Sequence, residues 1–235
     1  MPNGQPRSRM FRIIRAAVLV LVVLLLLPYL ITPLYLFGRP VSTLMLWRQV
    51  TGARVERIWT PLDQVAPVLP QSVIASEDGN YCRHRGIDFG ALREIWQEAE
   101  DISDMRGGST IAQQTAKNLF LWPGRSVVRK VLELPLSLWL DLVLGKRRMM
   151  EIYLNIAEWG PNGEFGVEAG ARRAFSKGAR DLSAREAALL AAVLPNPLRR
   201  NAARPGPGVR RLAGVYETRA RNSAKAECLK GGTGR

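Results

Sequence analysis

The feature that most constrains this chain is a run of 23 residues, 16–38, that carries no formal charge. Val, Leu and Ile dominate it, and as a helix it is about 35 Å long, enough to cross a hydrocarbon core of about 30 Å. Pro28 and Pro33 are expected to kink this helix or to shorten its regular part. Because the run has no polar face, residues 16–38 are predicted to form a transmembrane helix.

The charges before the run set its direction. Residues 1–15 carry four arginines and no acid, and the positive-inside rule therefore places the N-terminus in the cytoplasm. The alternative is a cleaved signal peptide, which has a shorter apolar stretch followed by an A-x-A-like site. No such site follows here, so we predict an uncleaved, single-pass anchor with the rest of the chain outside the cytoplasm.

A net charge of +14 is typical of proteins that bind nucleic acids. The excess lies at the two ends, however, since residues 199–235 hold ten basic side chains against two acids, whereas residues 16–198 are almost neutral. Together with the predicted location, this excludes a nucleic-acid partner. The basic end is expected either to contact anionic lipid headgroups or simply to be solvated.

Helical patterns dominate the rest of the chain. Thr110 with Gln113, and Ser183 with Glu186, each fit a capping box, and Asp88 fits a helix cap. A further helix is predicted over 127–143, bent at Pro135. Strand patterns are scarce, so the fold class is mainly α. The predicted organisation is a basic N-terminus (1–15), a transmembrane helix (16–38), a connector (39–65), a catalytic domain (66–198) and a basic helix or tail (199–235), with its helix starting at Val209.

A single histidine and two cysteines exclude multi-histidine metal sites and thiolate zinc clusters. An oxidising compartment would allow Cys82 and Cys228 to pair. The sequence does not show whether they do, and two free thiols are the simpler expectation.

Three segments carry candidate chemistry. In the first, Glu77 and Asp78 end a short apolar stretch and precede an irregular, glycine-bearing segment. A carboxylate beside apolar side chains has a raised pKa, which suits a general base. The alternative is an acidic helix end in solvent.

In the second segment, Gly107 and Gly108 precede a helix start that offers free N–H groups to an anion. Gln113 and Lys117 share one face of that helix, and Gln114 and Asn118 share the next. Amides with one ammonium suit a sugar–phosphate ligand. A solvated polar face is the alternative.

In the third segment, Arg129 and Glu133 share a helix face, and Arg125 and Lys130 add positive charge. An ordinary surface ion pair is the alternative. An acid–base pair beside a cationic cluster fits displacement of a phosphate leaving group. The chain has no P-loop and no G-x-G-x-x-G motif, so with a membrane anchor a lipid-linked diphosphate is the expected substrate.

Five ordered motifs across about residues 60–200 resemble the monofunctional biosynthetic peptidoglycan transglycosylases, the glycosyltransferase family 51 module also found in penicillin-binding proteins. The motifs are Glu77-Asp78 with His84 and Gly86; Gly107-Gly108-Ser109-Thr110-Ile111 with Gln113-Gln114 and Lys117-Asn118; Arg129-Lys130 with Glu133; Lys146 with Glu151, Tyr153, Leu154 and Asn155; and Phe165-Gly166-Val167-Glu168 with Ala171, Phe175, Leu182-Ser183 and Glu186-Ala187.

The resemblance implies a lysozyme-like fold in the bacterial inner membrane that polymerises lipid II into β-1,4-linked glycan strands and releases undecaprenyl diphosphate. It implies Glu77 as general base, Glu133 as second essential carboxylate, and Lys117 and Arg125 as stabilisers of the leaving diphosphate. Ser109, Gln113, Gln114, Asn118, Arg129 and Lys130 are then expected to bind substrate. No cofactor is required, although a divalent cation (Mg or Mn) assists some members at the diphosphate, and no dedicated metal site is visible. The expected partners are lipid II, the growing glycan, the membrane and other cell-wall synthesis proteins.

Two departures from the family matter. Tyr81 stands where the family usually has phenylalanine. A polar partner is therefore expected near its hydroxyl, and the ring is not expected to be fully buried. No S-x-x-K, S-D-N or K-T-G set follows the last motif, so the chain resembles the stand-alone form. The rival functions are a lytic hydrolase of finished glycan and a membrane-tethered scaffold. The cations Lys117 and Arg125 disfavour the hydrolase, and the intact Glu77 and Glu133 disfavour the scaffold.

Overall fold

The computed structural model describes residues 6–98, 108–124, 126–221 and 223–230, and it is mainly α. The α-helices are α1 (Pro6–Ile31), α2 (Thr43–Val50), α3 (Val68–Glu77), α4 (Phe89–Glu98), α5 (Ile111–Phe120), α6 (Val127–Ile156), α7 (Val167–Phe175), α8 (Ala184–Val193) and α9 (Pro207–Ala220). Short 3-10 helices are η1 (Thr32–Leu36), η2 (Leu62–Gln64), η4 (Ala179–Asp181) and η5 (Ser223–Leu229). Within the described ranges, the only sheet is a parallel pair, β1 (Glu56–Arg57) with β2 (Glu164–Phe165).

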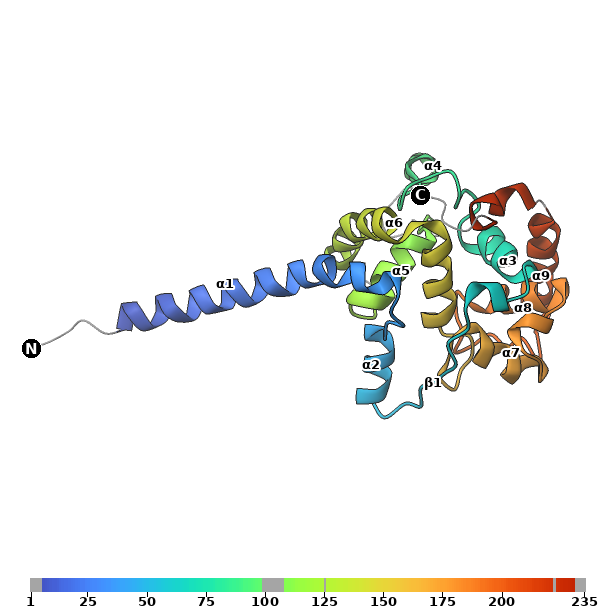
Figure 1. Ribbon diagram of the computed structural model, residues 1–235, viewed down its shortest axis with the longest axis horizontal. Helices are drawn as coiled ribbons and strands as arrows, with labels where there is room; N and C mark the ends of the chain where they lie inside the picture. The colour runs from blue at the N-terminus through green and yellow to red at the C-terminus, as the bar shows by residue number, and fades with distance from the viewer. Residues whose placement is uncertain (1–5, 99–107, 125, 222, 231–235) are drawn as a thin grey trace, which may run out of the picture.

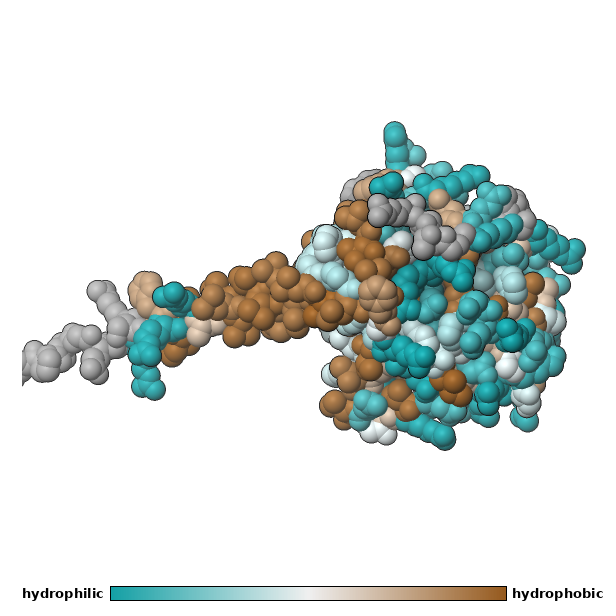
Figure 2. Space-filling view, viewed as in Figure 1, coloured by the Kyte–Doolittle hydropathy of each residue, from teal (hydrophilic) through white to brown (hydrophobic). Residues whose placement is uncertain are grey.

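Helix α1 extends away from the body of the protein (Figure 1) and presents an apolar surface along most of its length (Figure 2). The stretch Arg9–Leu36 has a mean hydropathy of 2.7 and is not buried against the rest of the chain. Pro28 is accommodated within the helix, whereas α1 ends at Ile31 and Pro33 lies in η1. The regular helix is therefore shortened, as expected, and remains long enough to span a bilayer.

The connector contains a helix that the sequence analysis missed. In α2, the side chain of Ser42 caps the start by accepting a hydrogen bond from the N–H of Met45 at 3.1 Å. The Thr43 hydroxyl lies within hydrogen-bonding distance of the carbonyls of Asn118, at 3.0 Å, and Leu121, at 2.5 Å. Helix α2 is thereby attached to the C-terminal end of α5. The available signal was the Ser-Thr pair before an apolar residue.

Helix α6 consists of two helical segments that meet at Gly145, and the first agrees with the predicted 127–143. Pro135 lies inside it, and the backbone leaves helical geometry ten residues later, at Gly145, with φ +66° and ψ 170°. Glycine has no Cβ and adopts this left-handed φ without steric cost. The break therefore falls at the glycine and not at Pro135, where the bend was expected.

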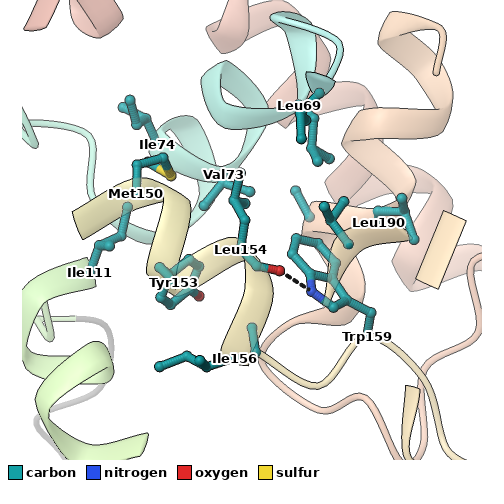
Figure 3. Packing of buried hydrophobic residues seen from close by; sticks show 14 of the residues in the cluster. Leu69, Val73, Ile74, Ile111, Met150, Tyr153, Leu154, Ile156, Trp159 and Leu190 are labelled. Carbon is teal, nitrogen blue, oxygen red and sulfur yellow. Dashed lines mark hydrogen bonds between the residues drawn. The ribbon is translucent and has the colours of Figure 1, made fainter. Parts of the chain in front are cut away.

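The half of α6 that follows Gly145 is the centre of the hydrophobic core. Its buried side chains pack with residues of α3, α5 and α8, and Trp159 donates from its indole nitrogen to the carbonyl of Leu154 at 3.1 Å (Figure 3). The labelled members of this cluster are Leu69, Val73, Ile74, Ile111, Met150, Tyr153, Leu154, Ile156, Trp159 and Leu190. Packing from four segments far apart in sequence fixes α3 and α5, which carry the candidate site, against one another.

The fourth motif holds the chain entering this core. Asn155 accepts a hydrogen bond from the N–H of Thr60 at 2.7 Å and donates to the Thr60 carbonyl at 2.8 Å. Glu151 accepts from the N–H of Leu62 at 3.1 Å. These polar groups satisfy the backbone of the segment that leads into α3.

The basic C-terminal segment packs on the domain. Helix α9 lies against α3 and α8, and Arg147 of α6 donates to the carbonyl of Leu229 at 2.8 Å. Cys228 forms a disulfide with Cys82, with 5.6 Å between their Cα atoms. The expectation of two free thiols is thus wrong, because the fold brings together two cysteines separated by 146 residues in sequence.

Removal of this disulfide is expected to lower stability, because the cross-link restricts the unfolded chain across a long loop. Cys228→Ser should reduce the free energy of unfolding by about 2–5 kcal/mol and the Tm by about 6–15 °C. Thermal unfolding in detergent, with and without reductant, measures this. The double variant Cys82→Ser/Cys228→Ser is the control, since its Tm should not respond to reductant. An equal Tm for the oxidised wild type and the double variant would contradict the prediction.

Candidate active site

The two adjacent acids at the end of α3 point to different partners. Asp78 accepts a hydrogen bond from the N–H of Ile111, the first residue of α5, at 2.9 Å through Oδ2. Its Oδ1 accepts from Nε2 of His84 at 2.8 Å. Asp78 is 7% exposed and holds the start of α5. Glu77 is therefore the acid of this pair that is left for chemistry.

The start of α5 has the predicted capping box. The Thr110 hydroxyl accepts from the N–H of Gln113 at 3.2 Å, and the Gln113 side chain accepts from the N–H of Thr110 at 3.0 Å. Thr110 also donates to the carbonyl of Gly86 at 2.6 Å. Gly86 has φ +72°, and a Cβ there would lie 2.5 Å from the carbonyl oxygen of Ser137. The glycine of the first motif thus permits close packing of α6 beside this turn.

Glu77 is held through one of its two oxygens. Gln114 donates from Nε2 to Glu77 Oε2 at 2.9 Å, and Tyr153 donates from its hydroxyl to Gln114 Oε1 at 3.0 Å. The other oxygen, Glu77 Oε1, is buried and has no hydrogen-bond partner among the described residues. Burial raises the pKa of Glu77 above the ordinary value of 4.5, although the hydrogen bond from Gln114, the adjacent Ser76 side chain and the charges of Lys117 and Arg200 oppose the rise.

The second carboxylate, Glu133, lies between two cations. Arg129 bonds to its Oε1, and Lys130 Nζ lies 3.1 Å from its Oε2. Lys130 also donates to the Ser109 hydroxyl at 2.8 Å. Glu133 is only 3% exposed, so its charge is compensated by these partners. The predicted residues Ser109, Arg129, Lys130 and Glu133 therefore form one cluster.

The charge of Lys117 interacts with both carboxylates, Glu77 and Glu133. Burial lowers its pKa, the charges of Glu133 and Glu77 raise it, and those of Arg129 and Lys130 lower it. Lys117 lines a cavity of about 280 Å³ together with Asn118 and Arg129, against a wall that includes Leu44, Leu121 and Trp122. Arg129 Nε is buried without a hydrogen-bond partner among the described residues. The cavity is thus lined by cationic side chains, which suit an anion.

The structure assigns some predicted site residues to other tasks. The Gln113 side-chain oxygen is engaged in the capping box, and Gln114 bonds to Glu77 through its amide nitrogen and to Tyr153 through its amide oxygen. Arg125 lies outside the described residues. A larger cavity of about 430 Å³, at the opposite end of α3 among Pro67, Gln71 and Arg147, contains none of the predicted site residues.

Two residues near Glu77 were missed. The charge of Arg200 lowers the pKa of Glu77, and the charge of Glu77 adds to the rise that burial causes in the pKa of Tyr216. Arg200 follows α8 and Tyr216 belongs to α9, within the segment taken from sequence as a basic helix or tail. No local pattern pointed to either, because only the packing of α8, α9 and the segment between them on α3 brings them to Glu77.

Tyr81, the departure from the family pattern, is completely buried. Its hydroxyl donates to the carbonyl of Lys146 at 2.7 Å, and the ammonium of Lys146 lies 4.7 Å from the centre of its ring. The expected polar partner is thus a backbone carbonyl. The expectation that the ring is not fully buried is wrong, because a hydroxyl whose hydrogen bond is satisfied can be buried at little cost.

A partly buried carboxylate with one oxygen free of hydrogen bonds suits a general base, and the cationic cavity lined by Lys117 suits an anionic group, as expected of a group-transfer enzyme. Residues 44–219 match the family described as Transglycosylase, and the chain belongs to that family. Its fold is accordingly lysozyme-like as well as mainly α.

Relatives match along nearly the whole chain. "Biosynthetic peptidoglycan transglycosylase" of Nitrobacter hamburgensis is 61% identical over 221 residues, covering 94% of this chain and 98% of the relative. Proteins of the same name from Rhodopseudomonas palustris strain TIE-1 and Agrobacterium fabrum are 57% and 54% identical. Those matches cover 96% and 88% of this chain, and 94% and 92% of the relatives.

Proposed function

We propose that this protein, a peptidoglycan glycosyltransferase, polymerises lipid II into β-1,4-linked glycan strands and releases undecaprenyl diphosphate during bacterial cell-wall synthesis. The observation that carries the proposal is the state of the Glu77 carboxylate. Its Oε2 accepts a hydrogen bond from Gln114, whereas its Oε1 has no hydrogen-bond partner among the described residues. The cationic cavity lined by Lys117 and Arg129 supports an anionic leaving group.

In the proposed reaction, Glu77 Oε1 takes the proton of the 4-hydroxyl on the acceptor sugar. The hydroxyl oxygen attacks the anomeric carbon of the donor with inversion, and the bond from that carbon to the diphosphate oxygen breaks. The leaving diphosphate keeps the electron pair. Positive charges placed in advance beside that oxygen stabilise the transition state, because they need no reorganisation as charge develops. We assign this task to Lys117, with Arg125 as a second cation on the strength of the resemblance.

Glu133 has a supporting role in this proposal. It accepts from Arg129 and Lys130, and so holds these two cations in place beside Lys117. Lys130 in turn holds Ser109. Asn118 lines the cavity with Lys117. We propose that these side chains together bind the diphosphate of the substrate.

Metal ions have no evident protein site in this scheme. Among the described residues, no group of three His, Cys, Asp or Glu side chains gathers to hold a metal ion. We propose that a divalent cation that assists transfer would be held mainly by the diphosphate of the substrate.

We further propose that the protein lies in the inner membrane with its N-terminus in the cytoplasm and its catalytic domain outside. The arginines at the N-terminal end of α1, before its uncharged stretch, support this direction. The Cys82–Cys228 disulfide supports it too, since disulfides persist in oxidising compartments. Apolar surface lies where α1 meets the body (Figure 2). Exposed apolar residues of the adjoining segments include Phe37, Leu46, Trp47, Leu138 and Leu142, which suits a lobe that rests on the membrane.

The pH dependence of the reaction follows from Glu77. A base must be ionised, and burial raises the pKa of Glu77 above 4.5, so activity is lost as the pH falls through a value higher than that of an ordinary glutamate. Initial rates of polymer formation between about pH 4 and pH 9 measure the acidic limb. A limb at or below 4.5 would contradict a buried glutamate base.

The proposed activity is tested with the purified full-length protein in detergent and labelled lipid II. We expect a polymer that a β-1,4-muramidase digests, together with release of undecaprenyl diphosphate. Isolated cell-wall glycan in a parallel reaction should remain intact. Cleavage of that glycan without polymer formation would show a lytic hydrolase. The absence of both activities would favour a scaffold.

A further inference from the structure

The Gln114 amide bridges Glu77 and a buried tyrosine. Glu77 ends α3, Gln114 lies in the first half of α5, and Tyr153 lies in the second half of α6. The hydrogen bonds run from the Tyr153 hydroxyl to Gln114 Oε1, at 3.0 Å, and from Gln114 Nε2 to Glu77 Oε2, at 2.9 Å. Three core helices therefore meet in one chain of donors and acceptors.

The direction of this chain depends on what each group can offer. An ionised carboxylate only accepts hydrogen bonds, so the amide must turn its NH₂ group toward Glu77. The amide oxygen then faces Tyr153, whose hydroxyl donates to it. Without the Tyr153 hydroxyl, the Gln114 amide could rotate by half a turn and bring its oxygen to Glu77. That orientation is favourable only when the Glu77 carboxyl group is protonated and can donate a hydrogen bond.

We propose that Tyr153 is a positioning residue for the transfer reaction: its hydroxyl fixes the orientation of the Gln114 amide, which holds Oε2 of Glu77 and leaves Oε1 as the oxygen that accepts the proton. This inference rests on the proposed function of Glu77 as general base. Tyr153 and Gln114 touch no reacting atom in this scheme.

The surroundings of Tyr153 suit a fixed donor. Its side chain is 1% exposed and lies in the core cluster with Val73, Met150 and Leu154 (Figure 3). Burial raises the pKa of Tyr153 well above 10.0, and the charges of Glu77 and Asp78 raise it further. The hydroxyl thus stays protonated wherever the enzyme works, and packing on three helices prevents its displacement.

Other groups also act on Glu77 and must be kept constant in a test. They are Lys117 on α5, Arg200 after α8 and Tyr216 on α9. A change at Tyr153 that removes one oxygen atom leaves all three in place. Its effect on the acidic limb therefore reports the orientation of the amide.

The experiment compares Tyr153→Phe with the wild type in lipid II polymerisation across the acidic pH range. We expect kcat at neutral pH to fall about tenfold or more, with KM changed by less than about threefold. The acidic limb should move to higher pH by about half a unit or more, because the freed amide no longer favours the ionised carboxylate. Gln114→Leu should show the same upward movement, and the double variant should be no worse than Gln114→Leu alone.

Tyr81→Phe is the matched control. Tyr81 is also a completely buried tyrosine, but its hydroxyl donates to the carbonyl of Lys146 and not into the Glu77 chain. Its acidic limb should stay at the wild-type pH. Tyr153→Phe or Gln114→Leu with a wild-type acidic limb would overturn the inference. An active Glu77→Gln would instead overturn the proposed function, so the two failures are distinguishable.

Discussion

Glu77→Gln should abolish lipid II polymerisation while lipid II binding persists. Glutamine has nearly the shape of glutamate and can still accept a hydrogen bond from Gln114, but it cannot take the proton of the acceptor hydroxyl. Loss of a general base costs about 10²–10⁴-fold in rate. Turnover is measured as release of undecaprenyl diphosphate, and binding is measured with labelled lipid II at equilibrium.

The stability of this variant separates lost chemistry from lost folding. Burial raises the pKa of Glu77 in the folded state, so stability falls as pH rises from 4.5, the value of an exposed glutamate, through the higher folded pKa. Glutamine carries no charge, and at neutral pH the Tm of Glu77→Gln should therefore equal or exceed that of the wild type. A near-wild-type rate from a folded Glu77→Gln would refute the assignment.

Lys117→Ala should reduce turnover by several powers of ten, on the order of 10³-fold. Lys117 lines the cavity beside Asn118 and Arg129 and is largely buried, so its charge acts on a leaving oxygen with little screening by water. Glu133 keeps Arg129 and Lys130 as partners in the variant, and the fold should persist. Rates are compared at saturating lipid II.

Lys177→Ala is the control for this loss of charge. Lys177 pairs with Glu186 at 2.8 Å on the surface, in a contact of the kind that contributes little. Its activity should match the wild type. If Lys117→Ala lost only a few-fold, the cation that stabilises the diphosphate would have to be sought elsewhere in the cluster.

Local patterns predicted much of the helical framework. Both capping boxes, at Thr110 and at Ser183, are present, because a cap is a relation between residues three apart and is visible in sequence. The apolar helix at the N-terminus was predictable for a similar reason, since its composition alone decides it. Helix α2 was missed although its cap, Ser42, is a local signal. What anchors this short helix is Thr43, which bonds to carbonyls at the end of α5, and only the folded chain brings these groups together.

The arrangement around Glu77 was only partly predictable. Motif spacing singled out Glu77, Gln114, Lys117 and Glu133, but it could not show that Gln114 contacts Glu77, because that contact depends on how α3 packs against α5. The same limit applies to the closeness of Arg200 to Glu77 and to the pairing of Cys82 with Cys228, because both depend on how distant parts of the chain pack together. Helix α6 was expected to bend at Pro135, but it breaks at Gly145. The break depends on a left-handed φ, which only the folded backbone reveals.

The most direct test of the account is a gel of the products that the wild type and Glu77→Gln form from labelled lipid II, at equal concentrations of folded protein. We expect a ladder of glycan chains from the wild type and only unreacted lipid II from the variant. Ladders of equal intensity would contradict the central claim that Glu77 is the base for glycan polymerisation.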